Sequence, residues 1–220
     1  MRTYVSTIGY YETRVVRPVL DHGLNEGNEV VLLRPRNDDA DGDSAVADVR
    51  KIFSEFGPGI EVTVERISYT DFSTAVVECL DVLAAADGET IANFGGGPRE
   101  IFLPFSVAAL VGGNEIDTVL QFTDIDQEVT EIQLPELMEP LPSKTHQTLR
   151  TLTDFEEAST LPEIAERSGQ SRSTVARHLD DLKVAGAVET EMRGKTRHVE
   201  LTLGGRLQLF RLEGFVDHFE

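Results

Sequence analysis

The sequence has one cysteine, no tryptophan and only four lysines among its 220 residues. Because Cys79 has no partner in the chain, an internal disulfide framework and a cysteine-based metal site are excluded. The five histidines have no ligand spacing, and no Ser-His-Asp pattern is present. The N-terminus has no apolar signal region, and no apolar run is long enough to span a bilayer. We therefore expect a cytoplasmic protein with no membrane partner.

Basic residues are scarce and unevenly distributed, and the net charge is −19. Residues 1–142 hold 26 acidic and nine basic residues, a charge of −17, whereas residues 143–220 hold 13 and 11, a charge of −2. A domain that faces DNA phosphates must limit its negative charge, so the second part agrees with DNA binding. Strong acidity with 16 arginines to four lysines is typical of extreme halophiles; the alternative is an ordinary acidic cytosolic protein.

The last third of the chain has the pattern of a winged helix-turn-helix domain. Thr160 and Glu163 form a capping box at the start of a short helix, which ends at Ser168–Gln170. Ser171 caps a second helix, and a hairpin over residues 188–201 would form the β-wing. Three apolar residues at i, i+4 and i+7 give the second helix one buried face: Val175, Leu179 and Leu182.

The exposed side of this second helix is where base edges are contacted in such domains. The cationic cluster at the turn of the hairpin favours phosphate contacts over a merely solubilising turn. For His178, a DNA-facing role and a partly buried structural role are equally compatible with the pattern. The predicted DNA-binding residues are Ser171, Arg172, Ser173, Thr174, Arg177, His178, Arg193, Lys195 and Arg197.

Residues 1–136 alternate between strand and helix patterns. Strands are expected at residues 3–8, 29–33, 61–68, 89–94, 118–122 and 129–134. Helices are expected at residues 14–26, 44–56, 72–86 and 99–111, with a polar loop at 37–43. This α/β alternation predicts a Rossmann-like, mostly parallel sheet with helices on both faces. A linker at residues 137–143 and a winged helix-turn-helix domain at residues 144–220 would follow.

Two unusual loops occur where a doubly wound sheet binds its ligands. In the strand order 3-2-1-4-5-6, ligands lie beyond the carboxyl ends of strands 1 and 4. Thr7–Thr13 follows strand 1 and Gly95–Glu100 follows strand 4. Three consecutive glycines that lead into a helix let backbone amides approach an anion, and Arg99 could reach a phosphate. The alternative for the glycines is a tight turn.

The loop after strand 1 does not match a dinucleotide-binding fingerprint. After Gly9 the chain has Tyr10 and Tyr11 where further glycines would stand, so NAD or FAD is not expected. Two tyrosines beside a glycine could frame a nucleobase; the alternative is that one of them packs against the sheet.

The segments Ser6–Glu12 and Asn93–Glu100 resemble the two motifs of CARF domains, the CRISPR-associated Rossmann folds. With the winged domain, the whole chain resembles the archaeal CRISPR-associated transcriptional regulators of the Csa type, and its composition suggests a haloarchaeal member. The resemblance implies a homodimer that binds one cyclic oligoadenylate, commonly cyclic tetra-adenylate, across its two-fold axis. The predicted ligand-binding residues are Thr7, Gly9, Tyr10, Tyr11, Glu12, Gly95, Gly96, Gly97, Pro98 and Arg99.

We therefore expect a ligand-responsive regulator of CRISPR-Cas genes that binds pseudo-palindromic double-stranded promoter DNA, with no catalytic residue, cofactor or metal. Glycine loops of this kind often carry hydroxyl residues where Gly95 and Pro98 stand here, which argues against cleavage of the ligand. Two alternatives stay open. One is a ring nuclease that degrades cyclic oligoadenylate, and the other is a metabolite-sensing regulator unrelated to CRISPR.

Overall fold

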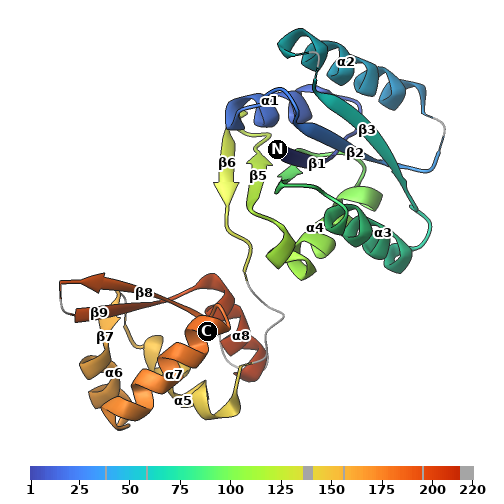
Figure 1. The fold of residues 1–220 in the computed structure, drawn as a ribbon. Coiled ribbons are helices and arrows are strands. Elements are labelled where there is room, and N and C mark those ends of the chain that lie inside the picture. The colour runs from blue at the N-terminus through green and yellow to red at the C-terminus, as the bar shows by residue number, and fades with distance from the viewer. Residues whose placement is uncertain (38, 58, 136–140, 156, 195, 214–220) are drawn as a thin grey trace. The chain divides into compact units, whose positions relative to one another are not determined.

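The computed structural model describes residues 1–37, 39–57, 59–135, 141–155, 157–194 and 196–213. The chain forms two compact units, Met1–Leu134 and Pro135–Glu220 (Figure 1). In the part of the chain that the structure describes, no helix is long and apolar enough to cross a membrane.

The first unit is built on a six-stranded sheet. Its strands are β1 (Arg2–Thr7), β2 (Glu29–Pro35), β3 (Glu61–Ile67), β4 (Glu89–Phe94), β5 (Thr118–Phe122) and β6 (Val129–Ile132). They lie in the order β3-β2-β1-β4-β5-β6, in which β6 is antiparallel to β5 and all other neighbours are parallel. This confirms the predicted Rossmann-like, mostly parallel sheet, and the strand order reverses between β1 and β4.

Helices cover both faces of this sheet (Figure 1). They are α1 (Thr13–His22), α2 (Ala40–Phe56), α3 (Phe72–Ala84) and α4 (Arg99–Val111), with a 3-10 turn η1 (Gly113–Glu115). Successive residues of a strand point to opposite faces, so a sheet covered twice needs apolar residues in unbroken runs. Tyr4 of β1 accordingly packs in the core under α1 and α2, and Val5 in the core under α3 and α4.

Two helix ends differ by four residues from the sequence-based expectation. Helix α2 begins at Ala40, so the predicted loop at residues 37–43 is wrong for its second half. Asp41 and Asp43 lie in the first turn of α2, where negative charge is favoured by the helix dipole. Helix α1 ends at His22 instead of residue 26, because Gly23 adopts a left-handed conformation with φ of 108°.

The second unit is a winged helix-turn-helix domain, as predicted. Its elements are η2 (Ser143–Thr145), α5 (His146–Leu152), β7 (Ser159–Thr160), α6 (Leu161–Ser168), α7 (Arg172–Val184), β8 (Val188–Arg193), β9 (Thr196–Leu201) and α8 (Leu203–Glu213). The strands form one antiparallel sheet in the order β7-β9-β8. The capping box of Thr160 and Glu163 is present at the start of α6. Its hydrogen bonds satisfy backbone donors that the first turn leaves free.

Candidate functional site

Buried hydrogen bonds tie the carboxyl ends of β1 and β4 together. The Thr7 hydroxyl donates to the Gly96 carbonyl. The Asn93 amide donates to the Ser6 hydroxyl at 2.8 Å and to the Arg14 carbonyl at 3.1 Å. Thr7, Ser6 and Asn93 are all fully buried, so water does not compete for these bonds. The two loops predicted to bind ligand are therefore held beside each other at the switch point of the sheet.

Gly97 brings the glycine loop against the β1 loop. Its φ is 109°, and a Cβ atom at this position would lie 3.3 Å from the backbone of Ile8. A side chain here would be strained by the backbone conformation and would push the two loops apart. Glycine is thus required at this position by both conformation and space.

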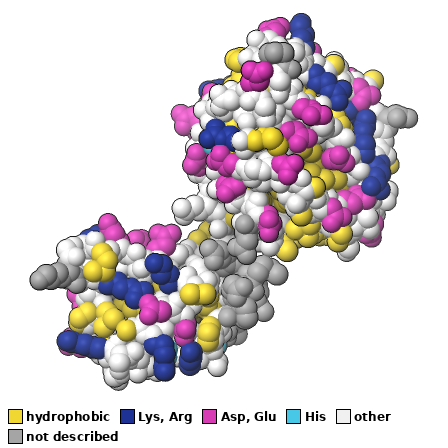
Figure 2. All heavy atoms as spheres, in the orientation of Figure 1, with side chains coloured by type: hydrophobic (Ala, Val, Ile, Leu, Met, Phe, Trp, Pro, Cys, Tyr) yellow, Lys and Arg dark blue, Asp and Glu magenta, His cyan; other side chains and the backbone are white. Residues whose placement is uncertain are grey.

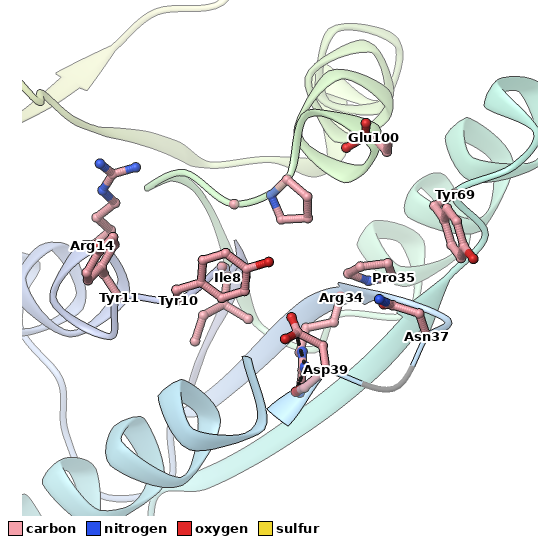
Figure 3. Close-up of a pocket in the computed structure, with 13 residues that line it drawn as sticks. Ile8, Tyr10, Tyr11, Arg14, Arg34, Pro35, Asn37, Asp39, Tyr69 and Glu100 are labelled. Atoms are coloured by element: carbon pink, nitrogen blue, oxygen red, sulfur yellow. Dashed lines mark hydrogen bonds and ion pairs between the residues drawn. The ribbon is translucent and has the colours of Figure 1, made fainter. Parts of the chain in front are cut away.

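A pocket of about 440 Å³ opens between these loops (Figure 3). That volume lies within the range of small-molecule sites. Five of the predicted ligand residues line it: Gly9, Tyr10, Tyr11, Gly97 and Pro98. Eight further residues of its wall were not predicted: Ile8, Arg14, Arg34, Pro35, Asn37, Asp39, Tyr69 and Glu100. Figure 3 shows Arg14 and Tyr11 at one end of the pocket and Asn37 and Tyr69 at the other.

The other predicted ligand residues lie outside the wall of the pocket: Thr7, Glu12, Gly95, Gly96 and Arg99. Thr7 and Gly96 bond to each other behind it. Gly95 packs so closely on the backbone at the start of α1 that a Cβ atom would collide there. Glu12 is the N-cap residue of α1, and Arg99 is exposed in the first turn of α4. These positions shape or flank the pocket.

Two arginines contribute to the pocket, in different states. Arg34 is 2% exposed, and its guanidinium lies 2.5 Å from the Asp43 carboxylate and donates to the Asp39 carbonyl at 3.2 Å. This guanidinium, aided by Arg66, lowers the pKa of Asp43. Arg34 is thus neutralised inside the protein, as a buried charge must be. Arg14 is more accessible, and a Cβ atom on Gly96 would lie 2.9 Å from its Nη1 atom.

Helices α1 and α4, like α2, begin at this end of the sheet without a side-chain cap. The N-cap residues Glu12 of α1 and Pro98 of α4 make no capping hydrogen bond from their side chains. First-turn amides of such helices stay available, and the helix dipole adds positive potential. Tyr10, Tyr11 and Tyr69 are exposed around the same pocket. The geometry therefore suits a ligand that has both anionic and planar aromatic groups.

The second functional surface is the helix-turn-helix. The Ser171 hydroxyl accepts a hydrogen bond from the Thr174 amide at 3.2 Å and caps α7. The predicted apolar face of α7 is fully buried: Val175, Leu179 and Leu182. Arg172, Ser173 and Arg177 are exposed on the same helix. Their accessibility is what contact with base edges in the major groove requires.

His178 differs from its predicted DNA-facing role. Its side chain is 4% exposed, and Nδ1 lies 2.8 Å from the Thr148 hydroxyl, which donates to Gln170 Oε1 at 2.7 Å. Burial, followed by the charges of Arg177 and Lys144, lowers the pKa of His178. The prediction that His178 faces DNA is therefore wrong, because its buried side chain ties α7 to α5.

The arginines of the wing are ion-paired. Arg193 Nε lies 2.7 Å from Glu191 Oε2, and Arg197 Nη1 lies 2.7 Å from Asp180 Oδ1. Asp180 is an exposed carboxylate on α7 that sequence reasoning missed, although it lies three residues after Arg177 on the same helix. Lys195 lies outside the described residues. Figure 2 shows several Lys and Arg side chains on the visible face of this unit.

The two units correspond to two known domain families, a Rossmann-like domain and a helix-turn-helix domain. Residues 2–133 match the Csa3 CRISPR-associated Rossmann-like domain, and residues 143–191 match the IclR helix-turn-helix domain. The chain belongs to the family of the Csa3 CRISPR-associated Rossmann-like domain, whose match spans more than half of it. A comparison with curated protein sequences gives no match.

Three solved structures are among those that match this chain. Csm6 from Enterococcus italicus, bound to cyclic hexa-2'-fluoro-hexa-dAMP, is 12% identical over 85% of this chain and 56% of that one, with a TM-score of 0.48. Protein VC1899 from Vibrio cholerae is 11% identical over 94% and 64%, with a TM-score of 0.47. The PcaV regulator from Streptomyces coelicolor, in complex with its natural ligand, is 25% identical over 36% and 57%, with a TM-score of 0.32. The chain thus spans less than two thirds of the length of each.

Burial of His178 predicts a pH dependence of the stability of the winged unit. Because its pKa in the folded state is lowered, the unfolded chain takes up the proton first as the pH falls. The stabilisation is complete well above the ordinary value of 6.5 and is lost as the pH falls from there toward the folded pKa. The slope for one proton cannot exceed about 1.4 kcal/mol per pH unit. Urea unfolding at several pH values between 7.5 and 5.5 gives the free energy of unfolding as a function of pH. This free energy should fall less steeply with decreasing pH in His178→Asn than in wild type. Equal pH dependences would contradict the burial of a neutral His178.

We expect substitutions on the exposed side of α7 and substitutions on the wing to affect DNA binding differently, because the first would remove base contacts and the second phosphate contacts. Arg177→Ala should cost about 1–3 kcal/mol on the true operator and relax the preference at one base pair. Arg193→Ala on the wing should weaken operator and scrambled DNA alike and lower the salt slope by about one unit. Fluorescence anisotropy with both DNAs over a salt series measures this. Identical profiles for the two variants would show that the roles are wrongly assigned.

Proposed function

We propose that this protein regulates the transcription of CRISPR-Cas genes in response to a cyclic oligoadenylate, foremost cyclic tetra-adenylate. The observation that carries the proposal is the pocket between the β1 and β4 loops. It combines uncapped helix N-termini and Arg14, which suit phosphates, with exposed Tyr10 and Tyr69, which suit the faces of adenines. Membership in the Csa3 family supports the link to CRISPR.

The symmetry of the proposed ligand supports a homodimer. A ring of four identical nucleotides has two-fold symmetry, so two copies, each with one such pocket, would each hold half of the ring. Helices α3 and α4 also expose four large apolar side chains that a second copy could cover: Phe72, Val77, Leu103 and Val111. In such a dimer the two winged units would contact two half-sites on pseudo-palindromic DNA.

The ligand would act by binding one arrangement of the dimer better than another. A ligand shifts a conformational equilibrium only by its difference in affinity for the two states. The apparent affinity for operator DNA should therefore change when the ligand is added, and the affinity for the ligand should change by the same factor when operator DNA is added.

We expect binding of cyclic tetra-adenylate without turnover. Purified protein is incubated with labelled cyclic tri-, tetra- and hexa-adenylate, and binding and products are followed by calorimetry and chromatography. Light scattering and footprinting on promoter DNA report the dimer and its two half-sites. Several turnovers per protomer would establish the ring nuclease instead. No binding of any ring, together with an operator response to an ordinary metabolite, would establish the metabolite sensor.

Gly96→Asp should abolish binding of cyclic tetra-adenylate while the fold is retained. Gly96 has φ of 129°, and a side chain there meets the Arg14 guanidinium, so an aspartate adds strain and a negative charge where phosphates belong. Gly113→Asp is the matched control, because its Cβ meets nothing within 4 Å and lies outside the pocket. Calorimetry should show at least a roughly tenfold loss for Gly96→Asp alone. Equal affinities for the two variants would remove the glycine loop from the site.

A further inference from the structure

Of the two arginines in the wall of the pocket, only Arg14 is accessible to an anionic ligand. Two cations and two carboxylates line the wall: Arg14, Arg34, Asp39 and Glu100. Arg34 is buried and already held by Asp43 and Asp39. Arg14 lies against Gly96, and its guanidinium is 5.9 Å from the centre of the Tyr11 ring. A phosphate that enters this pocket therefore finds its cationic partner in Arg14.

Arg14 is paired with an acidic residue from another part of the sheet. Its Nη2 atom lies 2.8 Å from Asp124 Oδ1. Asp124 belongs to the turn between β5 and β6 and does not line the pocket. A carboxylate and a phosphate oxygen seek the same guanidinium donors, so both compete for Arg14. The Asp124 side chain is 65% exposed, and an exposed pair of this type is weak enough to be exchanged.

The turn that carries Asp124 is closed by its own hydrogen bonds. The Thr123 amide donates to the Glu128 carbonyl and the Gln127 amide to the Thr123 carbonyl, both at 3.0 Å. Within the described residues, the Arg14–Asp124 pair is the one ion pair or hydrogen bond that joins residues 123–128 to α1. From this turn the chain continues through β6 to Leu134, the last residue of the first unit.

We infer that Arg14 binds a ligand phosphate in this pocket, that Asp124 competes with the phosphate for it, and that ligand binding thereby releases the β5–β6 turn. The inference rests on the proposed function, because it requires an anionic ligand in the pocket. It identifies Asp124 as a competing partner of Arg14, on the hairpin that precedes the second unit in the chain. Occupation of the pocket is thus coupled to the freedom of that hairpin.

Binding of cyclic tetra-adenylate to wild type and four variants tests the competition. Asp124→Asn should bind roughly two- to fivefold more tightly than wild type, since one exposed ion pair no longer has to be broken. Glu128→Gln is the matched control: it removes the same charge from the same turn, and its side chain contacts no charged group in the described structure. Arg14→Gln should bind at least about tenfold more weakly. Adding Asp124→Asn to Arg14→Gln should then change nothing further.

Hydrogen exchange tests the release of the turn. Residues 123–132 of wild type should exchange faster when cyclic tetra-adenylate is bound, and those of Asp124→Asn should exchange fast with or without it. Two results would overturn this inference and leave the proposed function intact. In the first, wild type binds the ligand but Asp124→Asn has the same affinity as Glu128→Gln. In the second, wild type binds the ligand but hydrogen exchange in the turn does not change. If neither wild type nor Asp124→Asn binds any cyclic oligoadenylate, the proposed function fails and the inference fails with it.

Discussion

The pocket of the first unit depends on the buried hydrogen bonds at the carboxyl ends of β1 and β4. Parallel strands that diverge at a switch point leave a crevice, and the loops beyond them keep a defined separation only if something holds them. Here the Thr7 hydroxyl holds Gly96, and the Asn93 amide holds both Ser6 and the Arg14 carbonyl. All three side-chain donors and acceptors are fully buried on strands, so the positions of the glycine loop and of α1 follow from the sheet itself. The pocket is therefore preorganised before any ligand enters.

Three arginines with a proposed phosphate-binding role have a carboxylate partner in the described structure. Arg14 is paired with Asp124, Arg193 with Glu191, and Arg197 with Asp180. An anionic partner, phosphate or DNA, must replace these carboxylates instead of meeting bare cations. For exposed pairs the energetic cost is small, about 0–1 kcal/mol each. In a chain with a net charge of −19, such pairing limits nonspecific attraction to polyanions and leaves selection to geometry and base contacts.

The sequence was sufficient to predict the topology and the proximity of the loops that follow β1 and β4, because these depend on local patterns. The strand–helix alternation, the triple glycine and the capping box at Thr160 are each read within a few residues. The rest of the pocket wall comes from three other segments: Arg14 on α1, Asn37 and Asp39 after β2, and Tyr69 after β3. No periodicity reveals that parallel strand ends bring these polar side chains to one cavity. The same limit applies to His178, whose burial depends on Thr148 of α5, 30 residues away in sequence.

On both proposed binding surfaces, phosphate contacts and contacts to bases respond differently to salt. Phosphate contacts lose free energy as salt rises, because fewer counterions are released into an already concentrated solution. The proposed base contacts of Arg172 and Arg177 and the proposed stacking on Tyr10 and Tyr69 would depend on salt far less. If the acidic composition reflects a cell with molar salt, the aromatic rim and the exposed face of α7 carry most of the discrimination there. As salt increases, the tyrosines should then supply a growing share of the ligand affinity, and Arg172 and Arg177 a growing share of the DNA affinity. The contributions of Arg14 and of the wing arginines should fall together.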